Sequence, residues 1–290
     1  MVEIDCPLCR IKNYTVLYEK DGFNIVRCRK CRLVFVNPRL SQSTITKRYN
    51  QGYYIRPKKA GKNHLGYDDY NQRYLTGKEQ WRNQLTLNKI EAYKKPVGKL
   101  LDVGAATGFF VRDAKKRGWQ AEGLEISAWA VKYAREKLRV KMFQGKLKDK
   151  RYPGNTFSVV AMNDVLEHVQ DPFDDLQEAY RILKRDGIIY VETLNFDGLI
   201  NTKLIGKKYI YIAPSLHLTY FAKKQLVAMV EKAGFKIKKI ELVSSSVGDF
   251  EYEGLRMYLK YLQLIVLSIL GLKKVKNWAF KDIIKVVAQK

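Results

Sequence analysis

The chain has 290 residues, of which 46% are hydrophobic, and its 54 lysines and arginines against 29 acidic residues give a net charge of +25. This apolar content is ample for a packed core and excludes wholesale disorder. The sequence shows neither an apolar stretch long enough to span a bilayer nor the core of a signal peptide, which predicts a cytoplasmic protein. The positive charge suits nucleic acid or an anionic membrane. Because the basic residues recur in small groups and never form a dense tail, a solvated basic surface is the favoured interpretation.

The only four cysteines of the chain form two C-x-x-C pairs, Cys6 with Cys9 and Cys28 with Cys31. Each pair can direct two thiolates at one ion, and four thiolates complete a tetrahedral site for Zn²⁺. A redox C-x-x-C is the competing interpretation, but such a pair usually opens a helix. Here the alternating segments NYTVLYEK and FNIVRC predict the strands of a zinc ribbon instead. We therefore expect residues 1–40 to form a ribbon around a structural zinc ion.

Residues 41–95 are polar and aromatic, with several clustered tyrosines and one amphipathic stretch, 81–93. Trp81, Leu87 and Ile90 are available for one broad face of a helix there. The segment is interpreted either as a helical cap over an active site, with aromatic side chains against the substrate, or as packing between the ribbon and the following domain. The sequence leaves both interpretations open.

The next stretch, LLDVGAATGFF, combines a short apolar strand, a turn that Gly104 and Gly108 allow, and the start of a helix. These elements form a nucleotide-binding device, because small residues let a ligand approach the backbone N–H groups at the helix start. The following strand, QAEGLE, ends on Glu125, whose carboxylate can accept hydrogen bonds from a ribose. A dinucleotide fingerprint would need glycine at Ala106 and Phe109, and a Walker loop would need Gly-Lys-Ser/Thr, so both are excluded.

Further motifs follow in order. The apolar strand FSVVAM runs into NDVLEHVQDP at residues 163–172, and LKRDG, HLTYF and EKAGF come later. Together with LLDVGAATG and GLEIS, this series resembles the class I S-adenosylmethionine (SAM) methyltransferases, in the group that includes ubiquinone-pathway O-methyltransferases and sugar methyltransferases. The resemblance covers about residues 99–242. The N-terminal part is similar to members that carry a zinc ribbon before the methyltransferase core, some of which act on deoxysugars.

The resemblance implies an α/β fold, in which a Rossmann-like class I methyltransferase sheet has helices on both faces. Residues 96–243 are expected to form this domain and to bind SAM. The cofactor-binding residues are then expected to be Asp102, Gly104, Ala105, Ala106, Gly108, Glu125, Ile126, Leu147, Asn163 and Asp164. In this family the turn at residues 145–147 faces the adenine, and an acidic residue there often binds its amino group. This sequence offers only Leu147 and Asp149 for that contact.

The run that starts at Asn163 differs from the N/D-P-P-Y/F motif, which holds an amino nitrogen. The absence of that motif favours a hydroxyl or an activated carbon as the methyl acceptor. Either acceptor must lose a proton, and His168 and His217 are the candidate bases because imidazole titrates near neutrality. Alternatively, Asp164, Glu167 and His168 bind a divalent metal, as a similar acidic-x-x-Glu-His run does in some related O-methyltransferases. In the third interpretation Glu167 and His168 brace the next helix, and His217 is an ordinary hydrogen-bonded loop residue.

Residues 244–290 are expected to form an apolar and basic helical segment. Its stretch 255–272 is strongly apolar, and lysines follow together with Trp278 and Phe280. This composition suits a helix that lies on an anionic bilayer at the inner face of the membrane, while docking on the core or on another subunit is the favoured interpretation. Both make a lipid-linked acceptor more plausible than a freely diffusing metabolite.

The sequence therefore predicts an enzyme that transfers a methyl group from SAM to an oxygen or carbon of a sugar-type or lipid-linked acceptor. Since four zinc-bound cysteines leave no free thiol, methylation through cysteine addition to a pyrimidine ring is excluded. The first alternative is an RNA methyltransferase that holds its substrate with the ribbon and the positive charge, and it predicts RNA binding that weakens steeply with salt. The second, a non-catalytic protein that keeps the fold, is disfavoured by the intact Gly104, Gly108 and Glu125.

Overall fold

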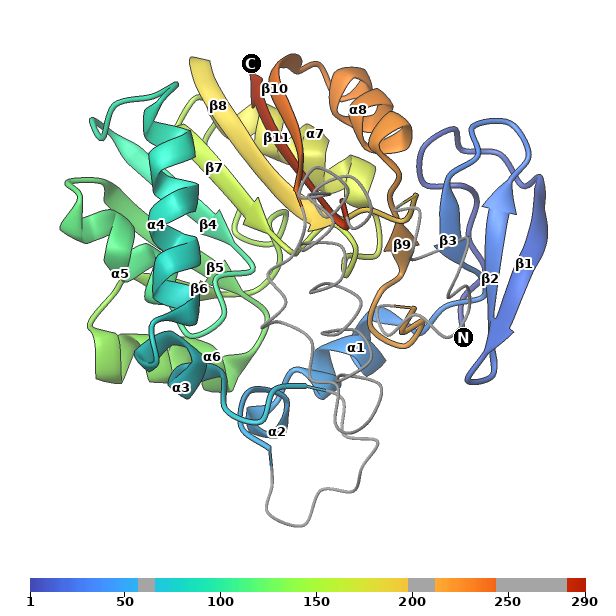
Figure 1. Cartoon of the computed structure of the whole chain (residues 1–290), viewed down its shortest axis with the longest axis horizontal. Helices are drawn as coiled ribbons and strands as arrows, with labels where there is room; N and C mark the ends of the chain where they lie inside the picture. The colour runs from blue at the N-terminus through green and yellow to red at the C-terminus, as the bar shows by residue number, and fades with distance from the viewer. Residues whose placement is uncertain (57–65, 198–211, 244–280) are drawn as a thin grey trace, which may run out of the picture.

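Two β-sheets organise the chain, a small one near the N-terminus and a large one beside it (Figure 1). The computed structural model describes residues 1–56, 66–197, 212–243 and 281–290. The small sheet has the strand order β1-β2-β3-β9, and the large sheet has the order β10-β11-β8-β7-β4-β5-β6. The small sheet carries the cysteines, and the large sheet carries the nucleotide-binding motif.

The small sheet is antiparallel, and most of it comes from the predicted ribbon. Its strands are β1 (Tyr14–Lys20), β2 (Phe23–Cys28), β3 (Val34–Val36) and β9 (Thr219–Tyr220). Asp21 and Gly22 join β1 to β2 with φ angles of 52° and 76°, the two-residue turn whose twist fits an antiparallel hairpin. Both strands predicted beside the cysteine pairs are therefore present. Because β9 comes from a distant part of the chain and pairs with β3, the ribbon is tied directly to the larger domain.

Five strands of the large sheet run parallel in the order β6-β5-β4-β7-β8. They are β4 (Lys99–Val103), β5 (Gln120–Glu125), β6 (Met142–Gln144), β7 (Phe157–Asn163) and β8 (Leu183–Leu194). A short apolar run such as FSVVAM is buried along its whole length, as is usual for parallel strands covered on both faces. The predicted fold class, an α/β Rossmann-like sheet, is confirmed.

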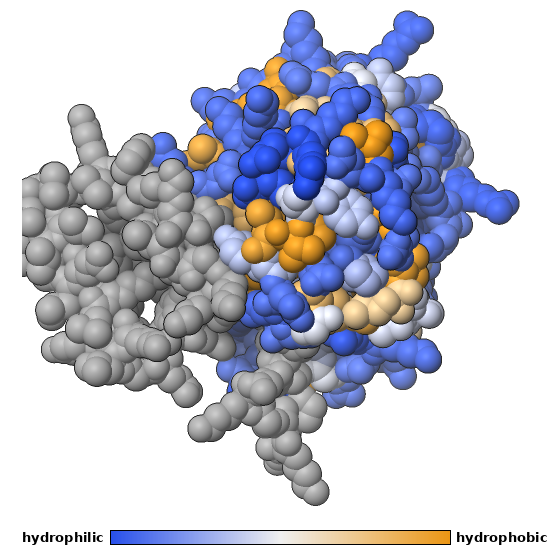
Figure 2. All heavy atoms as spheres, turned by 90° about the vertical axis from the view of Figure 1, so that its right-hand side faces the viewer, coloured by the Kyte–Doolittle hydropathy of each residue, from blue (hydrophilic) through white to orange (hydrophobic). Residues whose placement is uncertain are grey.

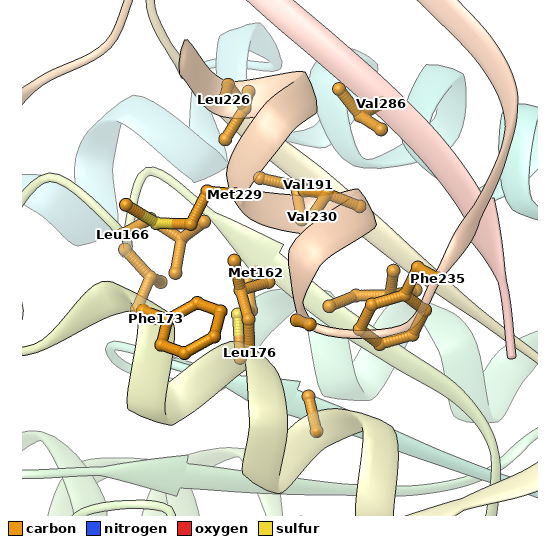
Figure 3. Packing of buried hydrophobic residues seen from close by; sticks show 14 of the residues in the cluster. Met162, Leu166, Phe173, Leu176, Val191, Leu226, Met229, Val230, Phe235 and Val286 are labelled. Carbon is orange, nitrogen blue, oxygen red and sulfur yellow. The ribbon is translucent and has the colours of Figure 1, made fainter. Parts of the chain in front are cut away.

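Helices cover both faces of this sheet (Figure 1). One face is covered by α4 (Lys78–Glu91), α5 (Phe109–Lys116), α6 (Ala128–Tyr133) and the π-helical turn η1 (Ala134–Leu138), and the other by α7 (Pro172–Ile182) and α8 (Lys223–Lys232). In the second layer Leu176 of α7 and Met229 of α8 pack with Met162 and Val191 of the sheet (Figure 3). Burial of these apolar side chains is the main term that holds the layers together.

Three short helices lie between the ribbon and α4. They are α1 (Gln42–Arg48), α2 (Gln51–Tyr54) and α3 (Tyr70–Leu75), with the N-caps Ser41, Asn50 and Asp69. Each cap accepts a backbone N–H of the first turn, which fixes where the helix begins. The amphipathic stretch predicted at 81–93 falls within and just after α4. There Leu87 and Ile90 are fully buried, whereas Trp81, expected on the same face, is 62% exposed.

Of the segment 244–290, which the sequence predicts to be helical, the structure describes residues 281–290, and there the prediction is wrong because they form a strand, β11 (Ile283–Gln289). It lies antiparallel between β8 and β10 (Lys236–Val243). Ile284 and Val286 pack on the α7–α8 side of the sheet, and Val287 packs on the other side. A run of β-branched residues buried on both sides favours a strand over a helix. The apolar stretch predicted to contact a membrane, 255–272, lies outside the described residues. Among the helices that the structure describes, none has the length and apolar content to cross a membrane.

Candidate active site

A cavity of about 380 Å³ lies at the carboxyl ends of β4, β5 and β7. Open α/β sheets bind their ligands at this edge. The cavity is lined by every predicted cofactor-binding residue except Gly108, namely Asp102, Gly104, Ala105, Ala106, Glu125, Ile126, Leu147, Asn163 and Asp164. The sequence motifs therefore converge on one cavity.

The turn after β4 presents backbone to this cavity. Gly104 has a φ of 70°, and a Cβ on it would lie 2.6 Å from Cγ2 of Val165, so a side chain would be both strained and blocked. Gly108 has a different role from the predicted one. Its φ is 81°, and a Cβ there would lie 2.9 Å from the Cβ of Ala134. It allows α5 to pack closely against η1, and it does not face the cavity.

Glu125 closes this turn from the end of β5. Its Oε2 accepts the N–H of Ala106 at 3.0 Å, and its Oε1 accepts the N–H of Ser127 at 2.8 Å. Burial raises the pKa of Glu125, and these backbone hydrogen bonds together with one from Tyr54 oppose the increase. The pKa of Asp102 is raised well above its usual value by burial and by the charge of Glu125. Two carboxyl groups thus line the part of the cavity that the resemblance assigns to the cofactor.

Tyrosines from the region of α1, α2 and α3 line the same cavity: Tyr49, Tyr53, Tyr54, Tyr67, Tyr70 and Tyr74. Their rings contact one another, with centroids 4.6 Å apart for Tyr49 and Tyr53 and 4.9 Å apart for Tyr67 and Tyr70. Burial raises the pKa of Tyr49 and Tyr53, so their hydroxyls stay protonated. Both interpretations of residues 41–95 find support, because tyrosines line the cavity and Tyr74 also packs on Phe109 of α5 with ring centroids 3.8 Å apart.

A charged network that the sequence did not reveal lies beside this cap. Arg82 of α4 bonds to the carboxylate of Asp164 and, at 2.8 Å, to Oε1 of Glu192. Lys285 and Tyr190 approach Oε2 of Glu192 at 3.0 Å and 2.8 Å. Burial alone would raise the pKa of Glu192, but the charges of Arg82 and Lys285 outweigh it and lower the pKa to about 2. The network fixes Arg82 and Asp164 in the cavity wall.

Replacing Arg82 with methionine is expected to destabilise the fold by about 3–5 kcal/mol, because it leaves Glu192 buried with one charged partner fewer. Urea unfolding measures this, and Lys132→Met, which removes the exposed pair with Glu136, is the control with an expected change of about 0.5 kcal/mol. In the parent protein the stability from Glu192 is fully present above pH 4.5, its unfolded pKa, and is lost as the pH falls toward 2. Equal stability of both variants would contradict the role of the network.

The divalent-metal site predicted at Asp164, Glu167 and His168 is not formed. Asp164, which has a positive φ of 51°, is bound to Arg82 in the large cavity, whereas Glu167 lines a separate cavity of about 10 Å³. In the described ranges the four cysteines are the one group of metal-ligating side chains close enough to share an ion. The turn after β7 therefore leaves Asp164 and His168 at the large cavity and turns Glu167 toward the small one.

His168 is positioned by two oxygen atoms. Its Nδ1 lies 3.1 Å from the carbonyl oxygen of Leu216 and 3.1 Å from the hydroxyl of Tyr49. Because a carbonyl can only accept, Nδ1 carries the proton and Nε2 keeps its lone pair. Burial lowers the pKa of His168 to about 4, so the ring is neutral at ordinary pH.

His217 lies behind His168, with ring centroids 4.7 Å apart. It lines the small cavity together with Glu167, Thr219 and Tyr220, and it does not line the large one. Burial and the charge of Asp164 raise the pKa of Glu167 to about 8. The structure thus brings His168, but not His217, to the wall of the cavity that contains the motif residues.

The two cysteine pairs sit on similar backbone loops. In each loop the carbonyl of the first cysteine accepts the N–H of an arginine, Arg10 for Cys6 at 2.9 Å and Arg32 for Cys28 at 3.0 Å. Both arginines have positive φ angles, 58° and 66°. The Sγ atoms of Cys6 and Cys31 are 3.4 Å apart, those of Cys9 and Cys28 are 3.5 Å apart, and all four lie within 4.8 Å of one another.

The ribbon is bonded to the helices beside the cavity. Arg10, which directly follows Cys9, pairs with Asp171 and Asp174 at the start of α7. The buried Arg39 donates to the carbonyl oxygens of Gln170 and Leu218, at 2.9 Å and 3.1 Å. On the outside, the face in Figure 2 is mostly hydrophilic with small apolar patches. The ion pairs of Arg10 and the hydrogen bonds of Arg39 therefore attach the ribbon to the larger domain.

Five parallel strands in this order, a glycine turn after β4 and an acidic residue at the end of β5 are the features of a SAM-dependent methyltransferase of class I. The family model of the methyltransferase domain matches residues 73–240, and the chain belongs to this family. A solved SAM-dependent methyltransferase from Archaeoglobus fulgidus has the same fold, with a TM-score of 0.52, 20% identity, and coverage of 75% of this chain and 99% of that one.

Two curated relatives extend the comparison. An uncharacterized protein of Methanocaldococcus jannaschii is 27% identical over 59% of this chain and 80% of its own length. A ubiquinone biosynthesis O-methyltransferase of Pelagibacter ubique is 29% identical over 56% of this chain and 72% of its own length. Both alignments leave more than a third of this chain uncovered.

Proposed function

We propose that this methyltransferase transfers a methyl group from SAM to a hydroxyl oxygen of a sugar-type or lipid-linked acceptor. The observation that carries the proposal is His168, a neutral imidazole in the cavity wall whose Nδ1–H is held by a carbonyl and whose Nε2 is left unprotonated. Two further points support it: the tyrosine cap offers ring faces and hydroxyls to a polyhydroxylated or ring-shaped acceptor, and the relative from Pelagibacter ubique is named as an O-methyltransferase.

The cavity residues divide into those that hold the cofactor and those that act on the acceptor. Glu125 would bind the ribose hydroxyls, and the backbone around Gly104 would lie against the methionine moiety. SAM supplies a methyl group on a positively charged sulfur, which is already activated for transfer. The protein then has to align the acceptor oxygen with that methyl group and take the hydroxyl proton on Nε2 of His168 as the new oxygen–carbon bond forms.

We also propose that Cys6, Cys9, Cys28 and Cys31 bind one structural zinc ion. Four thiolates at about 2.3 Å from a tetrahedral zinc ion stand about 3.8 Å apart. The observed Sγ separations, from 3.4 Å up to a limit of 4.8 Å, bracket this value. Metal analysis of the purified protein tests the assignment, and one zinc ion per chain is the expected result.

Replacing His168 with alanine is expected to lower kcat by about 100-fold or more, the usual contribution of a general base. Because the pKa of His168 is lowered to about 4, the base is already deprotonated at higher pH, and kcat of the parent should stay flat from about pH 5 to pH 8. His217→Ala and Tyr49→Phe are the controls, each expected to cost less than about tenfold. A loss below about tenfold in the His168 variant would show that another group takes the proton.

The acceptor is tested by incubating the protein with methyl-labelled SAM and separated cell fractions containing lipids, nucleotide sugars or RNA. Label in the lipid or sugar fraction supports the proposal, and base-stable label at oxygen distinguishes an ether from an ester. Label confined to RNA would instead support the alternative of an RNA methyltransferase. Absence of label from every fraction, with SAM bound, would favour the non-catalytic alternative.

A further inference from the structure

We propose that Asp175 of α7 accepts a hydrogen bond from the exocyclic amino group of the cofactor adenine. The inference rests on the proposed use of SAM and names the residue that distinguishes adenine from other bases. The residue that recognises adenine is thus placed on α7, across the cavity from the turn after β6. In the family that turn faces the adenine, but in this chain it presents no carboxylate to the cavity.

The turn after β6 is basic and apolar where it meets the cavity. Lys146, Leu147 and Lys148 line the cavity, whereas Asp149 does not. Oδ2 of Asp149 accepts the N–H of Lys146 at 3.1 Å, and its Oδ1 lies 3.8 Å from the ammonium group of the same residue. The carboxylate of Asp149 therefore stabilises its own turn and is not presented to a ligand.

The first turn of α7 faces this region, and Asp171, Asp174 and Asp175 all line the cavity. Nζ of Lys148 bonds to Oδ2 of Asp174 at 2.6 Å, which joins the turn after β6 to α7. Asp171 caps α7 and binds Arg10, and Asp174 also binds Arg10, at 2.9 Å. Both carboxylates are thus committed to protein partners.

Asp175 is different from its neighbours. Its side chain is partly buried and forms no hydrogen bond or ion pair within the described parts of the chain. Burial raises its pKa to about 7, against the opposing charge of Lys148. A carboxyl group that is desolvated beside a cavity and lacks a partner is a common sign of a ligand contact.

The order of the strands places adenine near this group. Gly104, Glu125 and Leu147 lie at or just beyond the carboxyl ends of the neighbouring strands β4, β5 and β6, so a ligand that lies across them meets the three in that order. With methionine at Gly104 and ribose on Glu125, the adenine reaches the turn at Leu147, which Lys148 connects to α7. The 6-amino group has two N–H donors, and the carboxylate of Asp175 accepts one of them.

The test compares binding of S-adenosylhomocysteine with binding of S-inosylhomocysteine, in which an oxygen replaces the 6-amino group. Calorimetry on the parent protein is expected to show a preference for the adenosyl compound of about tenfold or more. Asp175→Ala should bind the adenosyl compound about tenfold more weakly and lose most of this preference. Asp175→Asn should bind both compounds similarly, because an amide both donates and accepts.

Glu178→Ala is the control on the same helix, because Glu178 pairs with Arg181 and does not line the cavity, and it should keep the preference of the parent. The proposal is overturned when the parent binds both compounds equally, or when Asp175→Ala keeps the parental preference. The parental measurement and the asparagine variant decide the question even where the alanine variant does not fold. Failure of the parent to bind S-adenosylhomocysteine at all would refute the proposed function itself, which is a separate outcome.

Discussion

Replacing Glu125 with alanine is expected to weaken the binding of SAM by about 100-fold or more. Hydrogen bonds to a charged group contribute about 1.5–3 kcal/mol each, and the carboxylate of Glu125 would form two with the ribose diol. The same side chain also accepts the N–H groups of Ala106 and Ser127, so its loss frees the turn that surrounds the methionine moiety. Both effects act in the same direction and increase the dissociation constant.

Calorimetric titration with SAM measures the effect, and two further variants separate its causes. Glu125→Gln keeps a side-chain acceptor but loses the charge, so an intermediate loss is expected. Glu122→Gln changes a carboxylate on the same strand that pairs with Lys141 away from the cavity, so its affinity should match the parent. Unchanged affinity in the Glu125 variants would mean that the ribose is bound elsewhere, and the cofactor orientation used above would then be wrong.

The cavity could be predicted from the sequence because the residues at its centre belong to short turns between a strand and the helix that follows it. Gly104 directly follows β4 and Glu125 is the last residue of β5, and these two strands are neighbours in both the sequence and the sheet. The chemistry of each turn can therefore be interpreted without knowing the rest of the fold. The cysteine pairs are equally local, because each loop closes on itself through Cys6 or Cys28. Local hydrogen bonding and short spacing are what a single sequence reveals best.

The network around Glu192 could not be predicted, because its members meet only through long-range pairing. Arg82 comes from α4, and Lys285 comes from a strand inserted next to β8. A run such as IIKVVAQ has no periodicity that separates a buried strand from a buried helix, and the neighbouring apolar segment favoured a helix. The role proposed for Asp175 was not predicted either, for a related reason. Asp175 is one of several acidic residues in the first turn of a helix, where helix-dipole stabilisation is the ordinary interpretation.

Removal of the zinc ion proposed at the four cysteines is expected to unfold the ribbon and to lower kcat by about tenfold or more. Binding of a structural zinc ion is worth about 10–16 kcal/mol in small zinc domains, which is comparable with the whole stability of a typical domain. The loss should spread to the cavity, because Arg39 holds the carbonyl oxygen of Leu218 and β3 pairs with β9. These contacts fix the loop whose Leu216 carbonyl orients His168.

Cys28→Ser and treatment with a chelator test this coupling between the ribbon and the cavity. Hydrogen exchange is expected to increase in β1, β2 and β3, and also near residues 216–221, while β4 and β5 remain protected because their pairing does not involve the ribbon. Arg10→Ala keeps the zinc ligands but removes the pairs with Asp171 and Asp174, so it should retain zinc and show a smaller loss. If the metal-free protein kept its full kcat, the ribbon would be an independent module, and the orientation of His168 would depend on the larger domain alone.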